Sequence, residues 1–122
     1  MDACGLREIQ MEVRRMNQID ELQKQIHEDN KAKGWWDSER NTGELLMLMV
    51  TELAEAMEEY RNGKDMFYMQ DGKPEGLGVE LADCVIRILD MCEGFNINLS
   101  QLIDIKLTYN RTRSYRHGGK KA

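Results

Sequence analysis

The sequence predicts an all-α protein, an antiparallel four-helix bundle that is completed by dimerisation. Apolar residues recur at steps of three and four over long stretches, which is the period of an amphipathic helix. Only one proline occurs in 122 residues, which argues against an all-β chain with many tight turns. The ten glycines are few enough to lie between helices. The length fits one domain, which we place over residues 1–122 with a basic tail from about residue 114.

The first helix is predicted over residues 6–33, where apolar side chains form one stripe. The sequence Lys-Gly-Trp-Trp-Asp-Ser at residues 33–38 then breaks the period. Either Asn41 or Thr42 offers an N-cap for a second helix that ends near residue 61, because short polar side chains accept the free N–H groups of a first turn.

Two further helices are predicted in the second half of the chain. Residues 62–76 show no helical period and contain three glycines and the only proline, so we expect an exposed loop there. The third helix is predicted from about Glu75 to Glu93 and stops at Gly94. After a short link, the fourth begins near Ser100 and frays into the basic tail.

The third predicted helix is apolar around almost its whole circumference. Its narrow polar stripe consists of Glu80, Asp83, Arg87 and Asp90. A helix of this kind is normally buried in a bundle or an oligomer interface, so the stripe is expected to face protein or a cleft. A four-helix monomer of this size buries one apolar flank of the helix and hardly both, which predicts self-association.

The second predicted helix carries a matching row of acids. Glu52, Glu55 and Glu59 stand at i, i+3 and i+7, and by themselves they are typical of a solvated face. If Glu52 and Glu55 face Glu80 and Asp83, four carboxylates converge where repulsion and desolvation favour protonation. A divalent cation removes both penalties, and a set of oxygen ligands alone indicates Mg²⁺, with Mn²⁺ as the alternative.

Charge is distributed unevenly along the chain. Six bases and no acid in residues 106–122 give +6, whereas eleven bases and 22 acids in residues 1–105 give −11. Lys106, Asn110 and Arg113 follow one another at i, i+4 and i+7, a row of donors suited to phosphate oxygens. The alternative is a solvated basic helix end. The acidic body argues against binding of a specific nucleic acid, because it repels a phosphate backbone.

Several other classes are excluded by simple observations. The longest apolar run covers only residues 45–50, far short of a membrane span, and the first ten residues contain no apolar signal core. The three cysteines form no C-x-x-C pair, so neither a disulfide framework nor a zinc site is indicated. We therefore expect an unprocessed cytoplasmic protein without a membrane partner.

Four motifs follow one another along the chain. H-E-x-N at residues 27–30 precedes G-W-W-D, T-E-L-A-E-A-M-E-E-Y-R contains E-x-x-E, V-E-L-A-D-C contains E-x-x-D, and Y-N-R-T-R-S-Y-R-H-G-G-K-K-A follows at the end. This ordered set resembles the MazG-like branch of the all-α nucleoside triphosphate pyrophosphohydrolase superfamily over roughly residues 20–121. Many relatives open the first acidic motif with a Glu doublet, and Thr51 at that place leaves the four metal-binding positions intact.

The resemblance implies hydrolysis of a nucleoside triphosphate, in particular a deoxynucleotide, between its α and β phosphates to give a monophosphate and pyrophosphate. It implies that Mg²⁺ is held by Glu52, Glu55, Glu80 and Asp83. One of the glutamates, Glu55 ahead of Glu52, then accepts the proton of the attacking water. The resemblance also implies a homodimer or a tetramer built from dimers.

The residue chemistry offers substrate contacts for this reaction. Lys106 and Arg113 neutralise the phosphates, and Asn110 orients a phosphate or sugar oxygen. Of the two tryptophans after the first helix, one is expected to pack and the other to be exposed as a platform for a nucleobase. The candidates on this side are Trp35, Trp36, His27 and Asn30.

Two alternatives remain open at this point. A related enzyme acting on phosphoribosyl-ATP or dUTP has the same acidic motifs. A non-catalytic dimeric helical module, whose acidic stripe and basic tail mediate contacts, accounts for the charge pattern without any catalysis.

Overall fold

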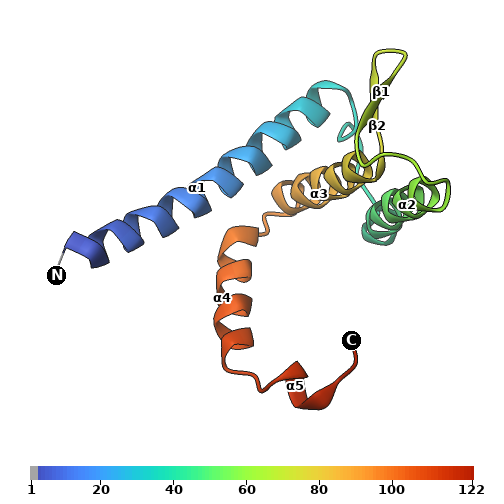
Figure 1. The fold of residues 1–122 in the computed structure, drawn as a ribbon. Helices are drawn as coiled ribbons and strands as arrows, with labels where there is room; N and C mark the ends of the chain where they lie inside the picture. Colours follow the sequence, from blue (N-terminus) through green and yellow to red (C-terminus); the bar gives the residue numbers. More distant parts are fainter. Residues whose placement is uncertain (1–2) are drawn as a thin grey trace. The chain divides into compact units, whose positions relative to one another are not determined.

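The computed structural model describes the backbone of residues 3–122 and the side chains of residues 18–122. The elements, in chain order, are α1 (Ala3–Ala32), α2 (Thr42–Arg61), β1 (Tyr68–Gln70), β2 (Lys73–Glu75), α3 (Leu77–Gly94), α4 (Leu99–Arg111) and α5 (Arg116–Gly119) (Figure 1). The mostly helical class is confirmed, and each of the four predicted helices is present. Their assembly into one antiparallel bundle, the single domain and the dimer remain predictions.

The chain separates into two compact units. One contains residues 22–96, and the other contains the preceding part of α1 together with residues 97–122. Within the larger unit, α2 packs against α3, and β2 contacts the same helix. The apolar core of the described residues is small, since it consists of Leu45, Ala56, Cys84, Leu89 and Cys92.

The predicted cap of α2 is formed by Asn41. Its Oδ1 accepts the backbone N–H of Glu44 at 2.9 Å, so one free donor of the first turn is satisfied. The cap fixes where α2 begins and, with it, the register of Glu52 and Glu55, about three and four turns further on.

The loop predicted over residues 62–76 contains a short hairpin, so that prediction was wrong for six of its residues. β1 and β2 pair antiparallel, with Met69 opposite Pro74. Asp71 and Gly72 both have positive φ, 51° and 79°, as a two-residue turn of the I′ type requires. The Tyr68 hydroxyl donates to both carboxylate oxygens of Glu59, at 2.9 and 3.0 Å, and ties the hairpin to α2.

The start of α3 lies against the chain that leads into the hairpin. The N–H of Gly78 donates to the carbonyl oxygen of Met66 at 2.9 Å. Gly76 has φ 117°, and a Cβ there would lie 2.4 Å from the same oxygen. Only glycine permits this close approach, which sets the position at which α3 begins.

In the smaller unit, Asn98 caps α4 by accepting the N–H of Gln101 at 3.2 Å. Ser100 donates to Asp20 of α1 at 3.0 Å. The basic tail does not simply fray, because residues 116–119 form the short turn α5. None of the helices in the described part of the chain is both long and apolar enough to cross a membrane.

Candidate functional site

Three of the four predicted metal ligands meet where α2 packs against α3. Glu52 comes from α2, and Glu80 and Asp83 come from successive turns of α3. One carboxylate oxygen from each lies within 4.8 Å of the others. Glu52 and Glu80 are only 7% and 8% exposed, so packing of the two helices concentrates negative charge in a poorly solvated space.

These buried acids have oxygens without a donor. Oε2 of Glu52 and Oε2 of Glu80 have no hydrogen-bond partner among the described residues. Burial, together with hydrogen bonding and repulsion from Glu55 and Glu52, raises the pKa of Glu80 to about 8. Near neutral pH Glu80 therefore holds a proton, which can satisfy one of the neighbouring oxygens.

The acidic cluster of Glu52, Glu80 and Asp83 has the donor atoms that a hard divalent cation prefers. Its donors are carboxylate oxygens, the ligands that Mg²⁺ prefers, and a cation can replace the proton on Glu80 and satisfy both unpartnered oxygens at once. Glu55 is exposed and lies close enough to Glu80 to influence its pKa. Its place as the fourth ligand and as the proton acceptor remains a prediction.

Arg87 adds a positive charge to the cluster. Its Nε–H donates to Oε1 of Glu52 at 2.8 Å. Burial raises the pKa of Glu52, but hydrogen bonding with Arg87, Glu80 and Glu55 and the charge of Arg87 outweigh burial, so the net pKa lies below its ordinary value. Burial and the charge of Glu52 raise the pKa of Asp83 against the opposing effect of Arg87. Glu52 is thus the acid most readily kept ionised, whereas Glu80 is the one most readily protonated.

A pocket of about 450 Å³ extends from this cluster. Glu52, Leu48 and Glu44 line it at spacings of four residues, so it follows one face of α2 for about 12 Å. The remaining lining residues come from α1, the loop after it and α3: Asn30, Trp35, Arg40, Asp83, Ile86, Arg87 and Asp90. Two predicted base contacts, Asn30 and Trp35, therefore line the same pocket as two predicted metal ligands.

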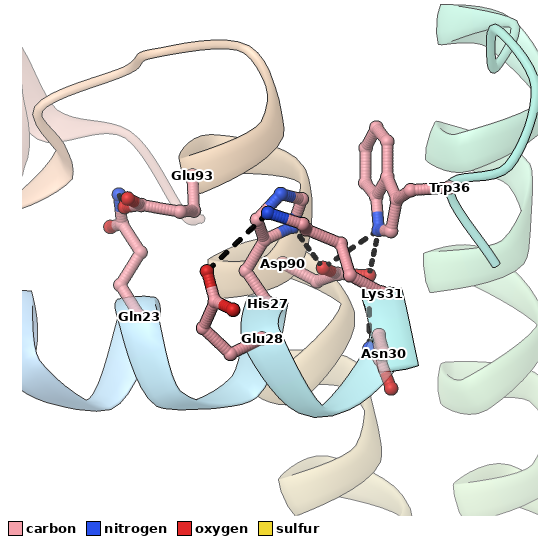
Figure 2. A network of polar contacts seen from close by, with 8 residues as sticks. All are labelled: Gln23, His27, Glu28, Asn30, Lys31, Trp36, Asp90 and Glu93. Atoms are coloured by element: carbon pink, nitrogen blue, oxygen red, sulfur yellow. Dashed lines mark hydrogen bonds and ion pairs between the residues drawn. The ribbon is translucent and has the colours of Figure 1, made fainter. Parts of the chain in front are cut away.

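Asp90 lines this pocket and lies at the centre of a network of polar contacts (Figure 2). Asp90 is 5% exposed, and its carboxylate lies 2.8 Å from Nδ1 of His27 and accepts a hydrogen bond from Nδ2 of Asn30 at 3.0 Å. The indole N–H of Trp36 lies 3.0 and 3.1 Å from its two oxygens. An indole nitrogen can only donate, so Asp90 accepts from Trp36, and Nδ2 of Asn30 donates to the same carboxylate. This network joins the end of α1 and the following loop to α3.

The two tryptophans have different environments, as the sequence predicts. Trp35 is 62% exposed and lines the pocket. Trp36 packs against Gly94, where a Cβ would lie 2.5 Å from its ring, and it contacts His27 edge-on with ring centroids 4.8 Å apart. His27 and Trp36, both predicted substrate contacts, are thus placed in the Asp90 network, and the lining of the pocket does not include them.

The predicted phosphate contacts lie in the other unit. Nζ of Lys106 and the guanidinium of Arg113 lie 4.8 and 5.7 Å from the centre of the Tyr109 ring. Asn110 lies beside them near the end of α4. The structure thus brings the two cations together around one aromatic ring, and their contact with phosphate remains a prediction.

The sequence predicts no functional role for Arg87, Asp90 or Arg40. Arg87 and Asp90 were visible on the polar stripe of the third predicted helix, and a polar residue on an otherwise apolar helix is a signal for a buried partner. The guanidinium of Arg40 lies 5.2 Å from the centre of the Trp36 ring. No local pattern indicates that contact, since it depends on the path of the loop.

Comparison of the chain with models of protein families, with curated proteins and with solved structures found no match. The likeness to the MazG-like branch therefore rests on the four motifs.

Proposed function

We propose that this protein is a Mg²⁺-dependent nucleoside triphosphate pyrophosphohydrolase that releases a monophosphate and pyrophosphate. One observation carries the proposal: a single pocket is lined by the buried carboxylate of Glu52, which has an unpartnered oxygen, by Asp83 and by the exposed indole of Trp35. The carboxylates suit a metal and phosphate group, and the indole suits a nucleobase. A solvated acidic face does not explain Glu52 and Glu80, because both are buried.

The residues of the pocket have separate roles in this reaction. Glu52, Glu80 and Asp83, with Glu55, hold the cation; when bound, Mg²⁺ polarises phosphoryl oxygens and lowers the pKa of water. Glu55 is exposed and accepts the proton of the attacking water. Arg87 orients Glu52 through the bond at 2.8 Å.

The length of the pocket suits a nucleotide. About 12 Å separates Glu44 from Glu52 along α2, enough for a base at one end and phosphates at the other. Lys106 and Arg113 stay the predicted contacts of the phosphate charge and Asn110 that of a phosphate or sugar oxygen; these residues belong to the other unit. Phosphoribosyl-ATP and dUTP are the alternative substrates.

We also propose that the working form is a dimer or a dimer of dimers. On α2, Leu46, Val50, Leu53 and Met57 follow one another at i, i+4, i+7 and i+11 and are 46–57% exposed. On α3, Leu81 and Val85 are exposed as well. Apolar stripes of this kind are typical of surfaces that a second subunit covers.

The test is release of pyrophosphate from a panel of deoxynucleoside triphosphates with Mg²⁺ and with EDTA. We expect metal-dependent turnover and a loss of at least about 100-fold in Asp83→Asn, because an amide replaces a charged ligand. Asp29→Asn is the matched control, since Asp29 is exposed and outside the pocket. Titration with Mn²⁺ should show weakened binding in Asp83→Asn alone. Lack of metal-dependent turnover of every nucleotide at micromolar enzyme would favour the non-catalytic helical module.

A further inference from the structure

The end of the pocket away from the carboxylate cluster has its own chemistry. Its lining residues there are Asn30, Trp35, Arg40 and Glu44. None of them belongs to the predicted metal set. Their side chains offer one exposed aromatic face, one cation and two groups with oxygen acceptors.

The amide of Asn30 has a determined orientation. A carboxylate accepts hydrogen bonds, and the indole N–H of Trp36, which can only donate, lies 3.0 and 3.1 Å from the two oxygens of Asp90. Asn30 must therefore present Nδ2 to Asp90, at 3.0 Å, and its Oδ1 turns away from that carboxylate (Figure 2). Asn30 thus presents its Oδ1, an acceptor, on the side away from Asp90. A rotation of the amide that exchanged Oδ1 and Nδ2 would break the bond to Asp90.

Glu44 supplies the second acceptor. It lies two turns before Glu52 on the pocket face of α2, and its carboxylate has no hydrogen bond or ion pair with another described residue. An ionised carboxylate only accepts hydrogen bonds. Arg40 is the donor among these residues, and its guanidinium lies over the Trp36 ring.

We infer that Glu44 selects substrates whose base carries an exocyclic amino group. This inference rests on the proposed function and names the substrate class of the same pocket. The base stacks on Trp35, its amino N–H donates to Glu44 or Asn30, and Arg40 donates to a ring or carbonyl acceptor. Uracil and thymine place a carbonyl oxygen where cytosine has its amino group, so that oxygen faces an acceptor and the complex is weaker.

Two pairs of nucleotides exchange the exocyclic amino group for a carbonyl oxygen, and in both pairs the adjacent ring nitrogen changes from an acceptor to an N–H donor. dCTP and dUTP differ at position 4 of the pyrimidine, and dATP and dITP differ at position 6 of the purine. The wild-type protein is expected to show at least about tenfold higher kcat/KM for the amino member of each pair that it turns over, the effect of one hydrogen bond to a charged group. Glu44→Gln should reduce that ratio to within about threefold, because an amide can both donate and accept.

Glu58→Gln is the matched control, since Glu58 is exposed on the same helix and does not line the pocket. It should keep the wild-type ratio. Equal kcat/KM for dCTP and dUTP in the wild-type protein would overturn the inference and leave the pyrophosphohydrolase intact. An unchanged ratio in Glu44→Gln would overturn it as well.

Binding without turnover separates the two proposals. Titration with dCMP and with dUMP, followed by quenching of tryptophan fluorescence, reports the base subsite in the absence of metal. We expect at least about tenfold tighter binding of dCMP, and loss of that preference in Glu44→Gln. If no triphosphate is hydrolysed, this measurement still decides the inference: a preference that depends on Glu44 supports it, and equal binding overturns it.

Discussion

Glu80 is the residue whose ionisation is most strongly changed by the fold. Burial and two neighbouring acids raise its pKa to about 8, whereas an exposed glutamate ionises near 4.5. Between these values the folded chain holds a proton that the unfolded chain has lost. Stability of the metal-free protein is therefore expected to fall as pH rises from about 4.5 to about 8 and to level off above that.

This expectation is tested by urea unfolding at pH 5.5, 7 and 8.5 in EDTA. The free energy of unfolding should decrease across the series in the wild-type protein and change less in Glu80→Gln, which cannot ionise. The raised pKa of Asp83 acts in the same direction, so some pH dependence remains in the variant. Saturating Mg²⁺ should restore stability at high pH, because the cation replaces the proton. An equal slope in both proteins would contradict the assignment.

At the scale of residues, the sequence predicts the positions of acids better than their partners. Glu80 and Asp83 lie one turn apart on any helix that contains them, so their common face follows from spacing alone. The bond from Arg87 to Glu52 joins residues 35 positions apart. Only the packing of α2 on α3 decides that this arginine meets that glutamate.

At the scale of elements, the Asp90 network joins α1, Trp36 in the loop after α1, and α3. Removing the carboxylate in Asp90→Ala leaves the donors of His27, Asn30 and Trp36 without a partner in a mostly buried place. We expect a loss of about 3 kcal/mol in the free energy of unfolding, measured with urea at constant pH. Asp29→Ala, in an exposed position on the same part of α1, should change it by less than about 0.5 kcal/mol. Similar losses in both variants would show that the network contributes little.

The junction of hairpin and α3 gives a second prediction at this scale. Gly76→Ala places a Cβ 2.4 Å from the Met66 carbonyl oxygen at φ 117°, so both the clash and the backbone strain oppose folding. Gly63→Ala is the matched control, because Gly63 also has positive φ but has open space around it. We expect a loss of about 1 kcal/mol in the control and at least about 3 kcal/mol at Gly76, measured by thermal or urea unfolding. Equal losses would mean that the close approach to Met66 does not matter.

The hairpin also shows what the sequence can indicate about an element. Asp71-Gly72 is a typical I′ turn pair, but the flanking residues lack the alternating pattern of a strand. Three-residue strands are too short to show periodicity. The bond from Tyr68 to Glu59 and the contact of β2 with α3 supply the support that local sequence does not display.

At the scale of the whole molecule, a small apolar core contrasts with much exposed apolar surface. Five buried apolar side chains form the core of the described residues. On α2, by contrast, the apolar row of Leu46, Val50, Leu53 and Met57 is about half exposed. We expect Leu53→Glu to weaken self-association by at least about tenfold, because it places a charge in an apolar interface. Sedimentation velocity across micromolar concentrations measures this. Gln70→Glu adds the same charge on the exposed hairpin and should have no effect, and a wild-type protein that remains monomeric would contradict the proposed dimer.

The sequence by itself determined the helical class, the cap at Asn41 and the spacing of the acids, because periodicity and capping depend on residues within a turn or two of one another. It also indicated that one tryptophan packs and the other is exposed, without showing which. Only the tertiary structure decided that Trp36 packs and Trp35 lines the pocket. It likewise decided that Glu52 meets Glu80 and that Asp90 anchors α1. These contacts join residues 28 to 63 positions apart, and their energies depend on burial that no local pattern encodes.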